Sequence, residues 1–290
     1  MKRGWLIVNG FLRSTKFDDL YALLANSAEK FGVELQLKNG AELVVIFGDE
    51  SRENRLKTPD FVLFWDKDEV LARLLERRNI PVFNGAKAIE ICDNKILTAE
   101  ALYTAGVQTP KTLLAPKTFE GVGYTDFTFL DQAEKTLGFP MIIKEAYGSF
   151  GAQVYLANTR KEAEQIIRKI GWKPFIMQEF IQESRGRDIR VNVVGDKVIC
   201  AILRENPRDF RSNITNGGTA KTVTLTKEQE TLALRACRAV NADFAGVDIL
   251  LGKDGPLVCE INTNPHFRST LDCTGIDLSE YILRYILERI

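Results

Sequence analysis

The feature that most constrains the fold is a stretch near the C-terminal end, where two apolar runs flank a turn signal. Residues 245–264 are AGVDILLGKDGPLVCEINTN, and Asp-Gly between apolar runs is typical of a β-hairpin. We expect residues 253–255 to form the loop, which places Leu250 opposite Val258 and Asp248 opposite Glu260. Because side chains alternate along a strand, one face of the hairpin would be apolar. Its members would be Val247, Ile249, Leu251, Leu257, Cys259 and Ile261.

The opposite face of this predicted hairpin carries Asp248, Glu260 and Asn262. Two carboxylates directly opposite each other on a sheet repel, so we expect a compensating group nearby. A Mg²⁺ ion held by oxygen ligands is one interpretation. Acid–base catalysis by the carboxylate pair is a second, and a solvated polar face is the third. The hairpin by itself leaves all three open.

The composition is that of a globular protein, and it excludes several kinds of site. The chain has 290 residues, of which 45% are hydrophobic and 27% charged, enough for about two domains or one large one. Lys+Arg and Asp+Glu number 39 each and form no long basic block, so we expect no nucleic-acid partner. The single histidine, His266, excludes most histidine triads and metal clusters.

The cysteines and the N-terminal residues bear on the cellular compartment. The five cysteines include no C-x-x-C pair, which indicates a reducing compartment and no structural zinc. The first apolar run is broken at Asn9-Gly10, too early for a signal peptide or a membrane span. We therefore expect a cytoplasmic protein without a membrane partner.

The first third of the chain predicts a small α/β unit. Residues 1–92 show the order strand, helix, strand, strand, helix, strand. Asp66 is expected to cap the second helix, with Glu69 three residues later as in a capping box. The segment Asn9-Gly10-Phe11-Leu12 after the first strand lacks a dinucleotide glycine fingerprint, which argues against an oxidoreductase.

Two features of the middle third suit phosphate binding. Lys144 lies within the apolar strand 141–145, and a glycine loop, Tyr-Gly-Ser-Phe-Gly-Ala at 147–152, separates that strand from the next. Successive backbone N–H groups in such a loop can bind phosphate. An edge-strand lysine and a plain hairpin turn are the more common interpretations of these features taken singly.

Three further groups of polar residues follow, and two of them have an ordinary alternative. Gln178 and Glu179 end a buried strand and need partners, either a purine edge or neighbouring loops. Asp188, Arg190 and Asn192 share one face of a predicted hairpin. The segment 211–213, Arg-Ser-Asn, lies before a glycine-containing loop, and this suits either an anion site or a surface loop.

Taken in order along the chain, these residues resemble the ATP-grasp superfamily, and more closely the RimK-type amino-acid (alpha-L-glutamate) ligases. The similar phrases are Arg-Ser-Asn at 211–213, Gly-Gly-Thr-Ala at 217–220, Ala-Gly-Val-Asp-Ile-Leu at 245–250, Gly-Pro-Leu-Val at 255–258, Glu-Ile-Asn at 260–262 and Thr-Gly-Ile-Asp at 274–277. The resemblance covers about residues 93–290. Residues 1–92 fit only the general α/β domain that precedes an ATP-grasp domain.

The resemblance implies a mixed α/β and α+β fold of the ATP-grasp type. A Rossmann-like pre-ATP-grasp domain would occupy residues 1–92. An ATP-grasp lobe with the phosphate loop and the adenine-binding strand would follow at 93–185, and a C-terminal lobe with the metal site at 186–290.

It also implies a role for each candidate residue. Phosphates would contact Lys95, Lys144 and the loop residues Gly148, Ser149, Phe150 and Gly151, and the adenine would meet Gln178 and Glu179. Asp188 and Arg190 would lie on the nucleotide side, Arg211 and Asn213 would act in catalysis at the γ-phosphate or acyl group, and Asp248, Glu260 and Asn262 would hold Mg²⁺ or Mn²⁺.

The function implied is an ATP- and Mg²⁺-dependent ligase that joins a carboxylate and an amine through an acyl phosphate. A glutamate-like amino acid would be added to a small-molecule or peptide carboxylate, and a homo-oligomer is possible in this group. The alternative is an ATP-binding regulatory module without turnover. Residues 263–268, Thr-Asn-Pro-His-Phe-Arg, depart from the small residues and glycine usual in the group, so we expect a bulkier pocket wall or a structural role for His266.

Overall fold

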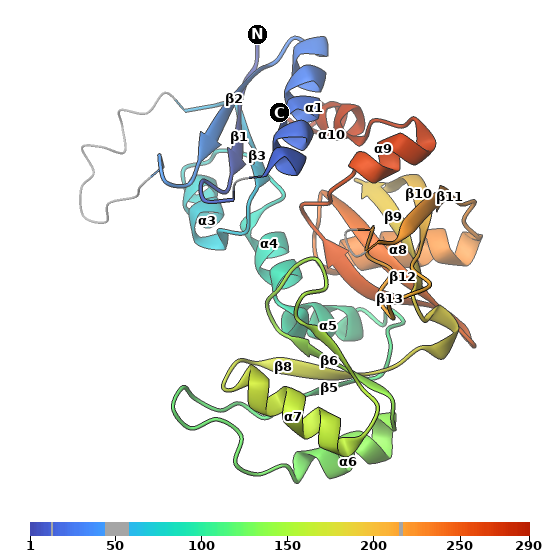
Figure 1. The fold of residues 1–290 in the computed structure, drawn as a ribbon. Helices are drawn as coiled ribbons and strands as arrows, with labels where there is room; N and C mark the ends of the chain where they lie inside the picture. The colour runs from blue at the N-terminus through green and yellow to red at the C-terminus, as the bar shows by residue number, and fades with distance from the viewer. Residues whose placement is uncertain (13, 44–57, 215–216) are drawn as a thin grey trace.

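The computed structural model describes residues 1–12, 14–43, 58–214 and 217–290, and these contain three β-sheets. Figure 1 shows the sheets in three successive units of the chain. The sheets lie within residues 3–83, 112–179 and 187–262. Each falls inside one of the three predicted domains, whose boundaries stay predictions.

The N-terminal sheet is parallel and has the strand order β2-β1-β3-β4. Its strands are β1 (Arg3–Val8), β2 (Glu34–Asn39), β3 (Phe61–Trp65) and β4 (Val82–Phe83). The chain runs outward from β1 to β2 on one side and continues through β3 and β4 on the other. The strand order therefore reverses between β1 and β3, where open α/β sheets usually bind ligands beyond the carboxyl ends of the strands.

Helices cover both faces of this parallel sheet. Buried residues of α1 (Thr15–Lys30) and α10 (Leu278–Leu287) form one core with the first face, and α3 (Glu69–Arg77) and α4 (Ala86–Asp93) pack on the second. The C-terminal helix α10 thus packs beside α1, as Figure 1 shows. Of the helices that the structure describes, not one combines the length and the apolar character needed to cross a membrane.

The prediction that Asp66 caps a helix is wrong. The helix α3 begins at Glu69, and its cap is Asp68, whose side chain accepts a hydrogen bond from the backbone N–H of Leu71 at 2.9 Å. Asp66 instead directly follows β3, and its carboxylate accepts a hydrogen bond from Asn9. Both aspartates lie within three residues of the start of the helix. Their roles differ because Asp66 contacts Asn9 at the end of β1.

The middle unit holds an antiparallel sheet in the order β5-β8-β6-β7. Its strands are β5 (Thr112–Leu114), β6 (Met141–Glu145), β7 (Val154–Ala157) and β8 (Phe175–Glu179), and its helices are α5 (Lys95–Thr104), α6 (Phe129–Leu137) and α7 (Arg160–Ile170). Since β6 pairs with β7 on one side and β8 on the other, Lys144 lies on an inner strand. The edge-strand interpretation of Lys144 is therefore wrong.

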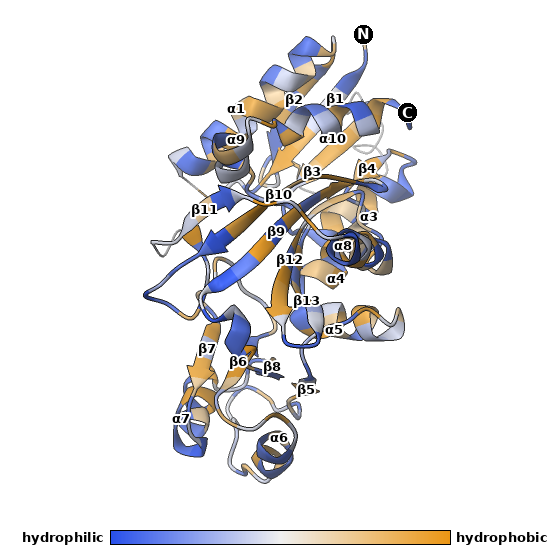
Figure 2. Cartoon of the chain, turned by 90° about the vertical axis from the view of Figure 1, so that its right-hand side faces the viewer, coloured by the Kyte–Doolittle hydropathy of each residue, from blue (hydrophilic) through white to orange (hydrophobic). Residues whose placement is uncertain are grey.

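The C-terminal unit holds a five-stranded antiparallel sheet in the order β11-β10-β9-β12-β13. Its elements are β9 (Arg187–Val194), β10 (Lys197–Glu205), β11 (Thr219–Thr222), β12 (Phe244–Gly252), β13 (Gly255–Asn262), α8 (Lys227–Ala239), α9 (Arg268–Thr274) and the 3₁₀ turn η1 (Gln182–Ser184). Apolar residues of α8 form one core with the sheet. Figure 2 shows the hydrophobic character of β12 in this sheet and of β1 and β3 in the N-terminal one.

The hairpin of β12 and β13 forms, but its register differs in part from the prediction. Asp248 lies opposite Glu260 as expected, whereas Gly252 pairs with Gly255, so the loop has two residues instead of three. The pairs Ile249–Val258 and Asp248–Glu260 leave Cys259 as an extra residue, which is a β-bulge. Val258 consequently joins the core, and the expectation that Leu257 and Cys259 belong to the apolar face is wrong.

Candidate active site

Asp248, Glu260 and Asn262 lie together on one face of the β12–β13 hairpin. Asp248 is directly opposite Glu260, and Asn262 pairs with Gly246, two residues before Asp248. The amide nitrogen of Asn262 donates to the backbone oxygen of Gly246 at 3.5 Å, and no described residue donates a hydrogen bond to its side-chain oxygen. The predicted cluster therefore exists in the folded chain.

Two arginines neutralise the Asp248 carboxylate. Arg190 donates to both of its oxygens, with Nη2 to Oδ2 at 2.9 Å, and Nη2 of Arg204 lies 3.0 Å from Oδ2. Burial raises the pKa of Asp248, but the two guanidinium groups more than offset this effect and hold the pKa below its ordinary value. Asp248 is consequently a stable anion in the interior.

Arg204 is a site residue that the sequence analysis missed. It is buried in β10 and donates to both oxygens of Asp188, from Nε at 2.7 Å and from Nη2 at 2.6 Å. Burial lowers the pKa of Arg204, but Asp248 and Asp188 together raise it above its ordinary value. The register of β9 and β10 places Arg204 opposite Asp188, so the predicted hairpin contained the signal that could have found it.

Glu260 is the member of the cluster that fits a bound cation best. Its carboxylate makes no hydrogen bond or ion pair with any described residue, although it faces a second carboxylate across the sheet. Two carboxylates and one amide oxygen form a donor set that suits Mg²⁺. Within the described ranges no group of three His, Cys, Asp or Glu side chains is placed to hold a metal, so the amide of Asn262 has to complete the set.

Lys95 and Lys144 converge on the same region from different elements. Lys95 begins α5, and its Nζ donates to the backbone oxygen of Gly148 at 3.3 Å. Nζ of the buried Lys144 donates to Oε1 of Gln178 at 2.7 Å and lies 3.4 Å from Sγ of Cys259. Burial is the main cause that lowers the pKa of Lys95, and Glu260 partly opposes it.

Gln178 and Glu179 are held by protein groups at the end of β8. Gln178 accepts from Lys144 and donates from Nε2 to Oγ1 of Thr112 at 2.9 Å. The carboxylate of Glu179 accepts from the backbone N–H of Lys111 at 2.7 Å. Both residues line a cavity of about 110 Å³ that also contains Lys144, Asp188 and Arg211.

The glycine loop connects two antiparallel strands and also meets the other two units. Ser149 accepts a hydrogen bond at 3.1 Å from Nζ of Lys67 in the N-terminal unit. The backbone oxygen of Gly151 accepts one at 2.6 Å from Nη1 of Arg211 in the C-terminal unit. Gly151 has φ +73°, and a Cβ there would lie 2.8 Å from Oδ1 of Asn213. The loop therefore contacts the N-terminal and C-terminal units in addition to connecting β6 and β7.

The metal-suited cluster lies where two cavities meet. The smaller of the two is the cavity of about 110 Å³ that Gln178 and Glu179 line. The larger has a volume of about 580 Å³. Both are lined by Gly151, Arg204, Asn213, Asp248 and Glu260. Among the predicted site residues, Gly148, Ser149, Phe150, Arg190 and Asn262 line only the larger cavity. Lys95 lines a third, narrow cavity with Lys144 and Glu260. Every predicted residue thus lines one of three cavities, and Glu260 lines all three.

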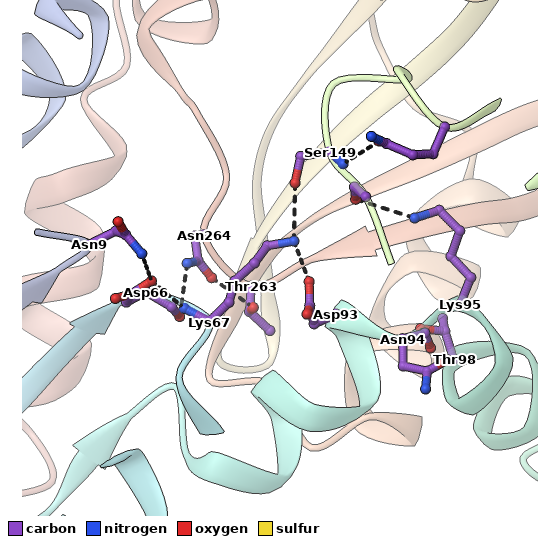
Figure 3. Close-up of polar contacts among 12 residues, drawn as sticks. Asn9, Asp66, Lys67, Asp93, Asn94, Lys95, Thr98, Ser149, Thr263 and Asn264 are labelled. Atoms are coloured by element: carbon purple, nitrogen blue, oxygen red, sulfur yellow. Dashed lines mark hydrogen bonds and ion pairs between the residues drawn. The ribbon is translucent and has the colours of Figure 1, made fainter. Parts of the chain in front are cut away.

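The larger cavity also contains residues of the N-terminal unit that the sequence analysis missed. Asn9 follows β1 and Asp66 follows β3, and Nδ2 of Asn9 donates to Oδ1 of Asp66 at 3.2 Å (Figure 3). Burial is the main cause that raises the pKa of Asp66. Lys67 turns its ammonium away to Asp93 and Ser149, as Figure 3 shows.

His266 and Lys16 line the same cavity. Nε2 of His266 lies 3.1 Å from the backbone oxygen of Lys16, and the imidazole packs edge-on against Phe17. Burial is the main cause that lowers the pKa of His266. Nζ of Lys16 lies 4.7 Å from the ring centre of Phe150, which is itself 6.2 Å from that of Phe17. His266 therefore both lines the cavity and holds the start of α1.

Comparison with known proteins gives a consistent result. The model of the RimK-like ATP-grasp domain family matches residues 92–286. A probable alpha-L-glutamate ligase 1 of Shewanella frigidimarina is 39% identical over 217 residues, which are 74% of this chain and 69% of the relative. A ribosomal protein bS6–L-glutamate ligase of Escherichia fergusonii is 36% identical over 206 residues, 70% of this chain and 66% of the relative.

Among solved structures, a RimK domain ATP-grasp protein of Sphaerobacter thermophilus has the same fold. Its TM-score is 0.73 at 20% sequence identity, and the match covers 98% of each chain. The similarity therefore extends over the N-terminal unit, although at this identity it concerns the fold alone.

Proposed function

The chain belongs to the RimK-like ATP-grasp family and is a ligase, and from this premise we propose that it joins a carboxylate to an amine at the expense of ATP. The observation that carries the proposal is the position of Asp248 and Glu260 at the junction of two cavities. A reaction between a nucleotide and a second substrate needs such an arrangement, because the transferred phosphoryl group must be reached from both sides.

The smaller cavity is proposed to hold the nucleotide. Lys95, Lys144 and the N–H groups of the loop 148–151 would bind its phosphates, and Arg211 would neutralise charge at the γ-phosphate together with Asn213. Gln178 and Glu179 would meet the adenine. The arginines on Asp248 and Asp188 support this assignment, because they show that the region is built to keep several charged groups in place.

Asp248, Glu260 and Asn262 would hold Mg²⁺, or Mn²⁺ in its place. The carboxylate of Glu260 supports this assignment, because the two arginines pair with Asp248 and no described residue pairs with Glu260. When bound, the ion would neutralise charge on the phosphate oxygens. Arg190 and Arg204 would then be free to turn part of their hydrogen bonding toward the reacting groups.

The proposed reaction proceeds in two steps. An oxygen of the carboxylate substrate takes the γ-phosphoryl group, the bond to the β-phosphate oxygen breaks, and ADP and an acyl phosphate form. The amine then attacks the acyl carbon, the bond to the phosphate oxygen breaks, and inorganic phosphate and a proton leave. The chain needs no nucleophile of its own, since its residues position the substrates and stabilise the developing charge.

The amine is proposed to be an amino acid, with glutamate as the first candidate because the relatives are named as glutamate ligases. A regulatory ATP-binding module without turnover would be favoured by the loss of a metal ligand or a phosphate lysine. The structure brings all of these residues together, so no observation favours that alternative.

ADP release by the purified protein tests the proposed function. Purified protein with Mg-ATP should release ADP only when an amino acid and a suitable carboxylate are both present, and mass spectrometry should detect the amide. Glu260→Ala should reduce turnover by roughly a hundredfold or more, because the charge that forms on phosphate would be poorly compensated. The exposed Glu120→Ala should leave it unchanged. Turnover by Glu260→Ala at the wild-type rate would contradict the proposed metal site.

A further inference from the structure

Lys67 is a cation of the N-terminal unit that reaches the glycine loop of the middle unit. It lies just after β3, at the carboxyl end of the parallel sheet. Its Nζ donates to Oγ of Ser149 at 3.1 Å and forms an ion pair with Asp93, as Figure 3 shows. The side chain of Lys67 is 45% exposed and lines the larger cavity, so a ligand in this cavity can reach it. The function proposed above assigns Lys67 no role.

Asp93 fixes the position of this ammonium group. It is the last residue of α4, where a carboxylate is unfavourable because the helix dipole is negative at that end. The ion pair with Lys67 compensates for this position. A lysine side chain is long and flexible, and such a pair restricts it to one place. The pair therefore holds a positive charge beside the loop whose N–H groups are proposed to bind phosphate.

Three ammonium groups lie close together around this loop. Lys95 donates to a backbone oxygen of the same loop. Burial is the main cause that lowers the pKa of Lys95, and the charges of Lys144 and Lys67 lower it further. The carboxylates of Glu260 and Asp93 act in the opposite direction. Like charges at short distance repel, so an anion that binds among the three lysines stabilises them. The phosphates of a nucleotide are such an anion.

The cavities indicate which part of a nucleotide Lys67 would meet. Lys144 lines the smaller cavity, and Lys95 lines the narrow one. Lys67, in contrast, lines only the larger of these three cavities. A nucleotide in the smaller cavity would extend its phosphates toward Glu260, which lines all three. The terminal phosphoryl group would therefore be the part of the nucleotide nearest to Lys67.

We propose that Lys67 contacts the terminal phosphoryl group of bound ATP, so that the N-terminal unit distinguishes ATP from ADP. The proposal rests on the ligase function above and adds a residue that lies outside the family match over residues 92–286. An ammonium group at this position stabilises the charge on the phosphoryl group while it passes to the carboxylate. Because ADP lacks this group, the contact exists only with ATP.

Isothermal titration of the full-length protein tests this contact without knowledge of the carboxylate or the amine. With Mg²⁺ present, the non-hydrolysable nucleotide AMPPNP and ADP are each titrated into the wild type and into Lys67→Met, which keeps the apolar stem and removes the charge. The variant should bind AMPPNP about tenfold more weakly, since a charged hydrogen bond is lost, and should bind ADP as the wild type does.

Two further variants show that the effect belongs to the charge at this position. Lys67→Arg should restore most of the affinity for AMPPNP, because a guanidinium group also binds phosphate. Lys87→Met removes an exposed lysine of α4 and should bind both nucleotides as the wild type does.

Acetylation of lysines in the wild type gives an answer even if a variant does not fold. Sulfosuccinimidyl acetate modifies accessible amines, and mass spectrometry measures the extent of modification at each lysine. AMPPNP with Mg²⁺ should slow the modification of Lys67 several-fold more than ADP with Mg²⁺ does. Lys87, whose side chain is 68% exposed, should react at the same rate with either nucleotide.

The proposal is refuted if Lys67→Met weakens AMPPNP and ADP equally or weakens neither. It is also refuted if both nucleotides protect Lys67 from acetylation to the same extent. These results would leave the ligase function intact, because the nucleotides still bind. Failure of the wild type to bind either nucleotide would instead refute the ligase function itself, and this proposal with it.

Discussion

Arg204 illustrates how a single residue can support both the fold and the site. It bridges two buried carboxylates, Asp188 and Asp248, in the interior of the five-stranded sheet. Removal of one member of a buried charged cluster leaves the other charges without compensation, and this usually costs more stability than the cluster contributes.

We predict that Arg204→Ala lowers the free energy of unfolding by about 3–5 kcal/mol. Urea unfolding without metal measures the loss. Mg²⁺ should stabilise this variant more than the wild type, because the ion would replace the positive charge that Arg204 provides beside Asp248. Arg238→Ala breaks the exposed pair with Asp196 and serves as the control, with an expected cost below about 1 kcal/mol. Equal stability of Arg204→Ala and wild type would contradict the role of this cluster.

Lys95 gives the site a pH dependence whose sign follows from burial. The pKa of Lys95 lies below its ordinary value of 10.5 in the free protein. Its ammonium, which would bind phosphate, is therefore lost as the pH rises, at a lower pH than for an exposed lysine. We predict that kcat/KM for ATP falls with rising pH below 10.5 for this reason.

Substitution of Lys95 by arginine tests whether Lys95 is the group whose titration lowers kcat/KM. Lys95→Arg should shift the fall in kcat/KM to higher pH, because a guanidinium keeps its proton throughout this range. Lys87→Arg, at an exposed position on α4, should leave the pH profile unchanged. A fall at the same pH in Lys95→Arg as in the wild type would show that another group titrates.

At the level of elements, the loop between β6 and β7 depends on backbone conformations that glycine favours. Gly151 has φ +73°, and a methyl group there would meet Asn213. Gly121 provides a matched comparison, since it has φ +81° and nothing lies within 4 Å of its Cβ position. The two substitutions share the cost of the left-handed backbone and differ in the displaced neighbour.

We therefore predict that Gly151→Ala lowers kcat/KM for ATP by roughly tenfold to a hundredfold, because a small displacement of positioning groups is costly in an active site. Gly121→Ala should leave kcat/KM unchanged. The melting temperature of each variant measures the cost of the left-handed backbone. Steady-state kinetics at varied ATP measure the effect of the displaced Asn213. Equal kinetics for both variants would contradict a catalytic position for the loop.

The bulge in β13 shows how one extra residue changes which side chains an element presents. The pair Ile249–Val258 is followed by Asp248–Glu260, so Cys259 has no partner across the hairpin and its thiol turns toward Lys144. A regular hairpin would have kept Cys259 in the core. Bulges are common next to functional sites because they redirect side chains in this way.

For the molecule as a whole, the two ends of the chain share one core. Ile282, Leu283 and Ile286 of α10 are fully buried against α1 and the N-terminal sheet, together with Phe244 and Phe267 of the C-terminal unit. Oγ of Ser27 and Oγ of Ser279 lie 2.6 Å apart at this contact. The N-terminal unit and the C-terminal sheet should therefore unfold together.

We predict that Leu283→Ala lowers the stability by about 2–5 kcal/mol, the usual cost of a cavity in a packed core. Trp5 and Trp65 are buried in the N-terminal sheet and the third tryptophan, Trp172, is exposed, so the change in tryptophan fluorescence on unfolding mainly reports this sheet, and far-ultraviolet circular dichroism reports the whole chain. The two transitions should coincide in the variant as in the wild type. Tyr281→Ala, partly exposed on the same helix, should cost much less. A separate early fluorescence transition would show that the two ends are independent.

The sequence by itself determined most of the local elements and the types of residue that the candidate site contains. Apolar alternation and turn residues fixed the hairpin that carries Asp248 and Glu260, because strand periodicity and turn geometry depend on neighbours in the chain. The resemblance to RimK-type ligases, from phrases such as Glu-Ile-Asn, was confirmed by the family match over residues 92–286. The residues predicted for the site all line one of three cavities that share Glu260.

Only the tertiary structure decided how distant segments combine. It placed Lys144 on an inner strand, turned Cys259 out of the core, and brought Asn9 and Asp66 to the cavity that Glu260 also lines. No local pattern encodes these outcomes, because they depend on which sheet edge faces which loop after the three units pack together. The charges of Asp66 and Lys16 were visible in the sequence, but that they share a cavity without pairing follows from packing alone.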